Sequence, residues 1–364
     1  MKLNWNAVFF PALVVVTFFH FGIAETKVGG VLGGENRWDL PGSPYVVECD
    51  ILIPRFAHLT IDPGVKVIIN KERYIPDTIE QFDALDSGSI SMRVEGTLSC
   101  LGKKNRRIVF VPAEPGENRL GWYGIIFQKV NGTFNEIAFT DITGAYYAVT
   151  VSGCDPMIRN SILEQNNIGI NCLKNGAALV FNCMIVNNFV AGIRVQQASP
   201  HIASSIIMKN RNNGLWCDGR SVVRFEYNCV YGNRDGDFLD CDPRLGRPAR
   251  ITKTKDSVDY AWNMVRDPVL FGSAADSIAF ARDVRIPTDT SKVKNKRLAR
   301  IMQKKPRDSS FIRYRAKQRP RFYLSRYSPC IDNGVPGNAF KDANGTRNDI
   351  GIYGGPDFFA RGKE

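Results

Sequence analysis

The chain has 364 residues, of which 44% are hydrophobic, and its formal net charge at pH 7 is +12. This composition supplies enough apolar side chains for a large core, which excludes a protein that is disordered throughout. Nine cysteines without a CxxC pair and only three histidines argue against a zinc-centred protein.

The first residues have the features of a signal peptide. Lys2 precedes an apolar stretch from Ala7 to Ile23, and small residues stand at the expected cleavage site after Ala24. A membrane anchor is the alternative, but the stretch is short for a bilayer span and contains Pro11. We therefore expect cleavage after residue 24 and a secreted, periplasmic or cell-surface protein without a membrane span.

An internal repeat of 22 to 23 residues occupies the middle of the chain, between about residues 147 and 240. Two polar columns and one apolar column recur with this period: Asn166, Asn188, Asn210 and Asn233; Asn160, Asn182 and Ser204; and Ile137, Ile158, Val180, Ile202 and Val223. Periods of this length indicate stacked supersecondary units rather than one compact globule.

Each repeat fits short strands better than helices, because it is rich in Val, Ile and Asn and its apolar residues alternate over short runs. In Gly-Ile-Asn-Cys (169–172), Gly-Ile-Arg-Val (192–195) and Gly-Leu-Trp-Cys (214–217), the second and fourth residues should point inward and the third outward. Asparagine suits the bends between strands, since it tolerates left-handed backbone and its amide can bond to the equivalent position in the next coil. The repeat thus predicts an all-β parallel β-helix.

Further stretches resemble the right-handed parallel β-helix proteins of the pectin-lyase-like superfamily, especially their secreted bacterial members. The segments SPYVVECDILIPRFAHLTIDPGVKVIIN (43–70), VEGTLSCLG (94–102) and 107–127 are similar to the opening coils of that group. The segment SPCIDNGVPGNAFKDANGTRNDIGIYGGP (328–356) is similar to its closing segment. The resemblance implies a right-handed solenoid over residues 25–243 and a closing segment over 327–364. Residues 244–326 depart from the family pattern and are expected to form a basic, partly helical insertion.

The positive charge is concentrated in the expected insertion. Residues 244–326 hold 22 Lys and Arg residues against 7 Asp, a local balance of +15. Such a segment suggests an anionic partner, with an acidic polysaccharide favoured over nucleic acid because no nucleic-acid recognition module is present. The alternative is a solvated loop whose charge only keeps a long solenoid soluble.

Candidate binding and catalytic residues follow from the outward positions of the Gly-Ile strands, since related β-helix enzymes place substrate along that sheet. Asn171, Arg194 and Trp216 should line up as substrate-binding residues, because an indole can stack on a sugar ring and a guanidinium can hold a uronate. Arg194 and Asp218 are candidate catalytic residues. The alternative is an ordinary solvent-exposed face.

Two other groups of acidic residues have possible roles. Asp237 and Asp240, in the sequence NRDGDFLDCDP with Asp235 and Asp242, could be the paired acids of a glycosidase, calcium ligands, or only the end of the solenoid. In DANGTRND (342–349), the side chains of Asp342, Asn344 and Asp349 and the carbonyl of Thr346 could bind Ca²⁺ around Gly345, or could form a turn.

The cysteine spacing argues against a regular disulfide framework. Cys172 and Cys217 occupy equivalent inward positions two coils apart, about 9 to 10 Å at sheet spacing, so they cannot pair. Cys241 and Cys330 flank the basic segment and could close it as a disulfide.

The sequence therefore favours a secreted β-helix protein that binds polysaccharide, acidic rather than neutral, along its outer face. A polysaccharide lyase or glycoside hydrolase on the same scaffold is the first alternative, and a structural surface protein is the second. The sequence does not indicate an oligomeric state.

Overall fold

The computed structural model describes residues 25–70, 89–114, 120–128, 134–241 and 321–356, together with residue 307 and short pieces between 253 and 279. The expected signal peptide and most of the basic segment 244–326 lie outside these residues. In the part of the chain that is described, no helix is long and apolar enough to cross a bilayer.

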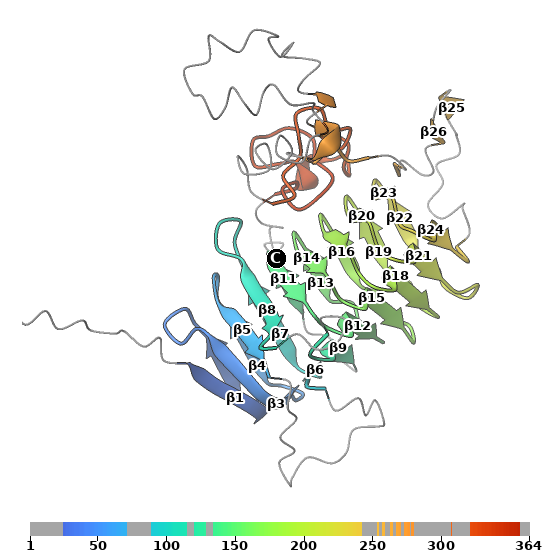
Figure 1. Ribbon diagram of the computed structural model, residues 1–364. Helices are drawn as coiled ribbons and strands as arrows, with labels where there is room; N and C mark the ends of the chain where they lie inside the picture. Colours follow the sequence, from blue (N-terminus) through green and yellow to red (C-terminus); the bar gives the residue numbers. More distant parts are fainter. Residues whose placement is uncertain are drawn as a thin grey trace, which may run out of the picture.

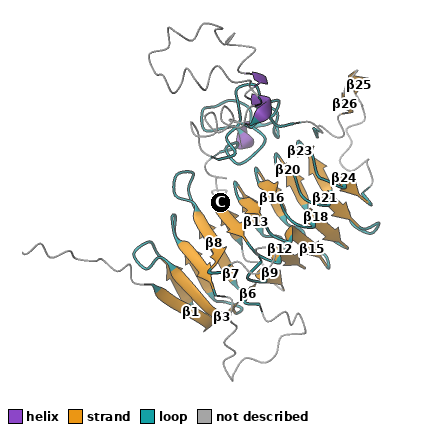
Figure 2. Ribbon diagram, in the orientation of Figure 1, coloured by secondary structure: helices purple, strands orange, loops and turns teal. Residues whose placement is uncertain are grey.

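The chain winds into a solenoid of parallel strands, with three strands in each complete coil (Figure 1). Each strand pairs with the strands one coil before and one coil after it, which forms three stacks. We call these stacks face 1, face 2 and face 3, in the order in which the chain visits them in each coil. Strands and loops make up nearly all of the described chain (Figure 2), so the predicted parallel β-helix is confirmed.

Face 1 is an eight-stranded sheet that contains β2 (Glu35–Trp38), β4 (His58–Ile61), β7 (Thr97–Leu101), β10 (Glu136–Ala138), β13 (Met157–Arg159), β16 (Leu179–Phe181), β19 (His201–Ala203) and β22 (Arg224–Glu226). Face 2 contains β5 (Lys66–Ile69), β8 (Ile108–Pro112), β11 (Thr140–Thr143), β14 (Ile162–Glu164), β17 (Met184–Val186), β20 (Ile206–Met208) and β23 (Cys229–Tyr231). Face 3 contains β6 (Ser91–Val94), β9 (Gly124–Gln128), β12 (Tyr147–Ser152), β15 (Ile168–Leu173), β18 (Ala191–Gln196), β21 (Asn213–Cys217) and β24 (Gly236–Leu239).

Faces 2 and 3 belong to one sixteen-stranded sheet, because the long strand β3 (Tyr45–Ile53) takes part in both. Its first residues pair with β5 and its last residues pair with β6. Strand β1 (Thr26–Val31) pairs with β3 at the amino-terminal end of the stack. A separate antiparallel pair, β25 (Lys253–Thr254) and β26 (Ser257–Val258), and the short 3-10 helix η2 (Asn338–Phe340) complete the named elements.

The interior of the solenoid is filled by the predicted inward residues. On face 3, Ile170, Ile193 and Leu215 stand in register and are fully buried. On face 1 the apolar column runs through Ile137, Ile158, Val180 and Ile202, as predicted. Its fifth member was predicted wrongly, because the residue in register with Ile202 is Phe225 and not Val223. The coil that contains it is one residue longer than the coil before.

The first asparagine column forms a ladder at the bend between faces 2 and 3. The Asn188 amide donates to Asn210 Oδ1 at 2.9 Å, and the Asn210 amide donates to Asn233 Oδ1 at 2.8 Å. This confirms the predicted bonds between coils. The left-handed backbone of this bend belongs to the residue before each ladder asparagine, with φ of 57° at Asn187 and 55° at Lys209.

Glycine follows the ladder because there is no room for a side chain. A Cβ atom on Gly192 would lie 2.7 Å from the Gly214 carbonyl oxygen and 2.8 Å from Asn210 Nδ2. Gly169 and Gly214 stand at equivalent positions with similarly close neighbours. The repeating Gly-Ile pair therefore places a residue without a side chain against the ladder and an apolar residue in the core.

The second asparagine column has a different role from the one predicted. Asn160 and Asn182 adopt left-handed backbone, with φ of 48° and 51°. The Asn160 amide donates to the carbonyl oxygens of Ile352 and Gly354 at 3.1 and 2.9 Å. These amides bind the carboxy-terminal segment rather than the next coil, and Figure 1 shows that segment alongside the solenoid.

The carboxy-terminal segment also covers the outer side of face 2. Side chains from both form a second apolar core: Ile162, Met184, Val186, Ile206, Met208, Cys229, Met264, Leu324, Cys330, Ile350 and Ile352. Strands β17 and β20 are consequently buried on both sides, which explains why Met-Ile-Val and Ile-Ile-Met are continuous apolar runs rather than alternating ones.

Two residues inside the expected insertion continue face 2 by one more coil. Asn263 Oδ1 accepts hydrogen bonds from the backbone and the amide of Asn228, at 2.8 and 3.2 Å. Met264 forms a parallel bridge with Cys229. The stacking pattern therefore extends beyond the last coil that the sequence repeat indicated.

Candidate functional site

The outer side of face 3 holds the residues expected to bind substrate. The strand register places Thr150, Asn171, Arg194 and Trp216 in one row across β12, β15, β18 and β21. The row lies on the outward side, because the residues before and after each member point into the core. Face 2 has a covering segment, whereas Arg194 and Trp216 keep part of their surface accessible to solvent.

Arg194 is the centre of this row. Its guanidinium carbon lies 5.1 Å from the ring centroid of Tyr147 and 5.7 Å from that of Trp216. Its Nε donates to Asn171 Oδ1 at 3.0 Å, and its Nη2 donates to the Tyr147 hydroxyl at 3.3 Å. Two aromatic rings and an amide therefore hold the cation in place across four coils.

A group of tyrosines extends the row toward the amino-terminal coils. The rings of Tyr146 and Tyr147 meet edge to face with centroids 4.7 Å apart, and Tyr123 contacts both. Burial raises the pKa of the Tyr123 hydroxyl to about 12. Tyr146 is 42% exposed and offers an aromatic surface to solvent. These tyrosines were not predicted from the sequence, although the pair Tyr146-Tyr147 at the start of a face 3 strand is visible in the repeat.

Thr150 lies at the amino-terminal end of the row and is only 6% exposed. Its hydroxyl oxygen is buried and forms no hydrogen bond with the described residues. Because a buried hydroxyl without a partner is costly, this position weakens the fold unless another group satisfies it.

Asp218, a candidate catalytic residue, caps the turn that follows β21. Its carboxylate accepts hydrogen bonds from the backbone of Gln197 at 3.0 Å, from the backbone of Arg220 at 3.2 Å and from the Ser221 hydroxyl at 2.6 Å. The bond from Ser221 lowers the pKa of Asp218, with desolvation opposing it. These bonds use three of the about four acceptor sites of the carboxylate, so Asp218 has a structural role in this turn.

The candidates Asp237 and Asp240 lie in or beside the last coil of face 3. Asp237 Oδ1 accepts a hydrogen bond from the Asn233 amide at 2.7 Å, so it takes the place of the next asparagine in the ladder. Asp240 has left-handed backbone with φ of 54°, and Asp235 lies 4.0 Å from the guanidinium of Arg234. Asp242 lies outside the described residues.

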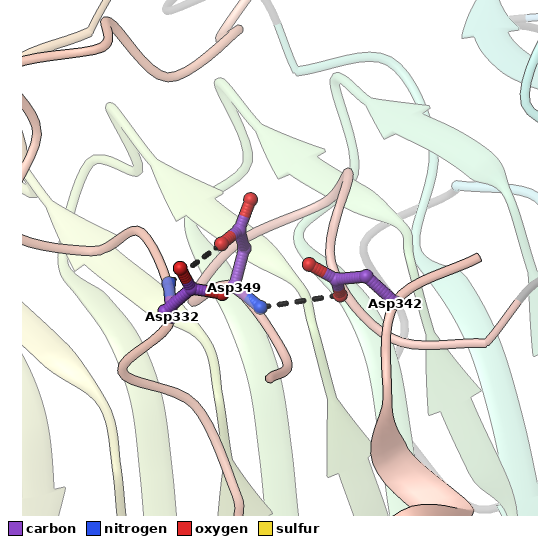
Figure 3. Close-up of side chains that lie close together, drawn as sticks. All are labelled: Asp332, Asp342 and Asp349. Atoms are coloured by element: carbon purple, nitrogen blue, oxygen red, sulfur yellow. Dashed lines mark hydrogen bonds between the residues drawn. The ribbon is translucent and has the colours of Figure 1, made fainter. Parts of the chain in front are cut away.

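The candidate metal loop brings together two of its four predicted ligands and one residue that was not predicted. One carboxylate oxygen from each of Asp332, Asp342 and Asp349 lies within 4.8 Å of the others (Figure 3). Asn344 Oδ1 instead accepts from the backbone and hydroxyl of Thr346, at 3.0 and 2.8 Å. The Thr346 carbonyl accepts from the Asp342 backbone at 3.1 Å, so these two predicted ligands form a turn.

The charges of neighbouring carboxylates disfavour the charged forms of Asp342 and Asp349. Burial, with smaller contributions from the charges of Asp342 and Asp332, raises the pKa of Asp349 to about 6, against a hydrogen bond from the Asp332 backbone. Burial also raises the pKa of Asp342. A bound cation would relieve this repulsion.

Comparison with known proteins identifies the fold but not the activity. Residues 117–242 match the family model described as the right handed beta helix region. Neither the curated proteins nor the solved structures contain a significant match. The matched range covers β9 to β24 and therefore includes the row from Thr150 to Trp216.

Proposed function

We propose that this chain, a right-handed parallel β-helix protein, binds acidic polysaccharide along the outer side of face 3. The observation that supports the proposal most is the position of Arg194 between two aromatic rings. A guanidinium has five N–H donors, and the hydrogen bonds of Arg194 use one at Nε and one at Nη2. The remaining donors are available for a carboxylate.

Besides donors for its carboxylate, a sugar ligand needs a flat apolar surface for its ring, and the aromatic rings beside Arg194 provide one. Trp216 and the exposed Tyr146 provide apolar surfaces with polar edges, on which a sugar ring can lie while its hydroxyls reach solvent. The row crosses successive coils, and adjacent coils are separated by about 4.8 Å. A chain molecule lying across the strands could therefore contact several coils at once.

We place binding before the lyase or hydrolase alternative because two of the candidate acids, Asp218 and Asp237, already have structural roles. Asp218 is held by three hydrogen bonds and Asp237 by the asparagine ladder. A structural surface protein without a ligand remains the third hypothesis.

The proposal includes secretion of the mature chain and a contribution from the basic segment. Export would place the protein where acidic polysaccharides occur, and the charge of residues 244–326 would attract them over a distance set by ionic strength. Both rest on the sequence, because the relevant residues lie mostly outside the described part of the chain.

A test of the proposal is binding of the mature chain to polygalacturonate and alginate, with neutral glucan as the comparison ligand. Arg194→Gln should weaken binding about tenfold or more, since hydrogen bonds to charged groups contribute about 1.5–3 kcal/mol. Trp216→Ala should weaken it less, by about 2- to 10-fold. Arg55→Gln is the matched control, because Arg55 also lies over an aromatic ring, that of Phe56, at the exposed amino-terminal end. Equal binding by the Arg194 and Arg55 variants would refute the proposal.

We propose calcium binding at the carboxylates of Asp332, Asp342 and Asp349 as a separate function. Carboxylate oxygens are the ligands that Ca²⁺ prefers, and three of them converge here. Calcium should raise the melting temperature, and Asp342→Asn combined with Asp349→Asn should abolish the rise. An identical melting temperature in calcium and in chelator would refute calcium binding and favour the alternative that residues 342–349 only form a turn.

A further inference from the structure

Two cysteine side chains meet at the carboxy-terminal end of face 3. The Sγ atoms of Cys217 and Cys241 are 3.1 Å apart, within hydrogen-bonding distance for thiols. Cys217 also closes β21 with its side chain in the solenoid core, at 3% exposure. Both are free thiols in this structure, as are the other seven cysteines.

The strand register explains how these two residues meet. Trp216 pairs with Leu239, so Cys217 stands one residue beyond the pairing and Cys241 two residues beyond it. The left-handed backbone of Asp240, with φ of 54°, takes up the extra residue and turns Cys241 toward the core. Adjacent strands are separated by about 4.8 Å, which falls within the Cα separation of about 4.4–6.8 Å that a disulfide requires.

The two thiols differ in access and in acidity. Cys241 is partly exposed, whereas Cys217 is buried beneath it. The hydrogen bond between the two thiols lowers the pKa of Cys241, and the same bond, together with burial, raises the pKa of Cys217. Cys241 therefore has the larger thiolate fraction and the better access to a reagent in solvent.

We propose that Cys217 and Cys241 form an intramolecular disulfide that fastens the last coil of face 3. The oxidant is a small-molecule disulfide, of which oxidised glutathione is the example used below. The Cys241 thiolate attacks one sulfur of the oxidant and releases one thiolate. After losing its proton to solvent, Cys217 attacks the Cys241 sulfur of the mixed disulfide and releases the second thiolate. Two protein thiols are oxidised, and one small-molecule disulfide is reduced to two thiols.

The bond would act on the end of the solenoid beside the proposed binding row. Among the described strands, β24 has one neighbour in face 3, and its residues Phe238 and Leu239 are exposed. A covalent link to β21 would hold this end strand against the strand that contains Trp216. The inference does not depend on the proposed polysaccharide binding.

The full chain is first tested by counting thiols after oxidation. The folded protein is incubated with oxidised glutathione, denatured, alkylated with N-ethylmaleimide and weighed by mass spectrometry. Oxidation should reduce the number of alkylated cysteines from nine to seven, and peptide mapping should show a Cys217–Cys241 link. Oxidation should also raise the melting temperature, and a reductant should reverse the rise.

Variants separate this pair from the other thiols. Cys217→Ser should leave Cys241 as a mixed disulfide with glutathione, because the resolving thiol is missing. After oxidation, the Cys241→Ser variant should still have all eight of its remaining cysteines alkylated, because the thiol that attacks the oxidant is missing. Cys183→Ser, which removes a fully buried thiol elsewhere in the core, should still lose two thiols on oxidation.

Three results would overturn the inference. Nine alkylated cysteines after oxidation of the folded natural chain would show that the pair does not react. A link between Cys154 and Cys172 would show that another pair reacts in its place. A Cys241–Cys330 link would support the alternative bridge that the sequence allows, although Cys330 lies in the second apolar core on face 2. Because all three are measured on the natural chain, a misfolded variant would not obscure them.

Discussion

Asn182→Asp should detach the carboxy-terminal segment from the solenoid. The amide nitrogen of Asn182 donates to Asn348 Oδ1 at 2.9 Å, to the Asp349 carbonyl at 2.8 Å and to the Gly351 carbonyl at 3.2 Å. Aspartate has nearly the same shape but replaces this donor with an oxygen. The three oxygen atoms that accept from Asn182 would then face a carboxylate oxygen, which is also an acceptor and is charged at neutral pH.

The magnitude follows from the number of bonds and from burial. A hydrogen bond contributes about 1 kcal/mol net, and an unsatisfied buried polar group costs about 1–3 kcal/mol. Asn182 is 1% exposed, so solvent cannot replace the lost donor. We expect the free energy of unfolding to fall by about 3–5 kcal/mol at pH 7, with a smaller loss at low pH, where the carboxyl can be protonated and donate.

Urea denaturation gives the free energy, and hydrogen exchange over residues 328–355 reports whether the segment has separated. Asn175→Asp is the matched control, because Asn175 also has left-handed backbone, with φ of 63°, but is exposed. That variant should differ from the natural chain by about 0.5 kcal/mol or less. Equal destabilisation of the two variants would refute the idea that Asn182 binds the segment through its amide.

Three further changes test the core, the ladder and the carboxylates. Ile193→Asp should prevent folding, since it buries a charge without a partner; a normal β-type circular dichroism spectrum with cooperative melting would contradict this. Gly192→Ala should cost about 1–3 kcal/mol because its Cβ would lie 2.7 Å from a carbonyl oxygen, whereas Gly219→Ala, with open space around it, should be nearly neutral in denaturation. In chelator, Asp349 binds more protons in the folded than in the unfolded chain between pH 4 and its pKa of about 6, so its contribution to stability falls as pH rises through this window. Asp349→Asn should remove this pH-dependent loss of stability, which is about 1 kcal/mol after allowance for solvent screening. If the free energy of unfolding differs between pH 4.5 and pH 7.5 by the same amount in the variant as in the natural chain, the raised pKa of Asp349 is refuted.

The sequence alone determined which residues enter the core and which row faces outward. In stacked coils of nearly equal length, equivalent positions lie directly above one another, so a period of 22 to 23 residues aligned Ile170 with Ile193 and Asn171 with Arg194. Alternation along each strand then decided the direction of each side chain. The prediction at Val223 was two residues short of Phe225, the residue in register with Ile202, because the interval between coils varies and local spacing does not show where extra residues are accommodated.

Only the tertiary structure decided what each outward residue contacts. Asn182 and Asn210 both recur with the repeat, yet one binds the carboxy-terminal segment and the other binds the next coil. Their partners differ because the segment returns from more than a hundred residues away to cover face 2, and its docking depends on surface shape and paired hydrogen bonds. In the sequence, the continuous apolar runs of β17 and β20 were the local feature that indicated burial of face 2 on both sides.

The same distinction holds for the candidate sites. The sequence placed Arg194 beside Trp216 because both belong to one repeat column, but the contact with Tyr147 required the register of three strands, β12, β15 and β18. Asp332 joined Asp342 and Asp349, and Cys241 met Cys217, through backbone turns outside the regular repeat. A repeat specifies positions relative to its own period, whereas side chains outside that period are brought together by the path of the whole chain.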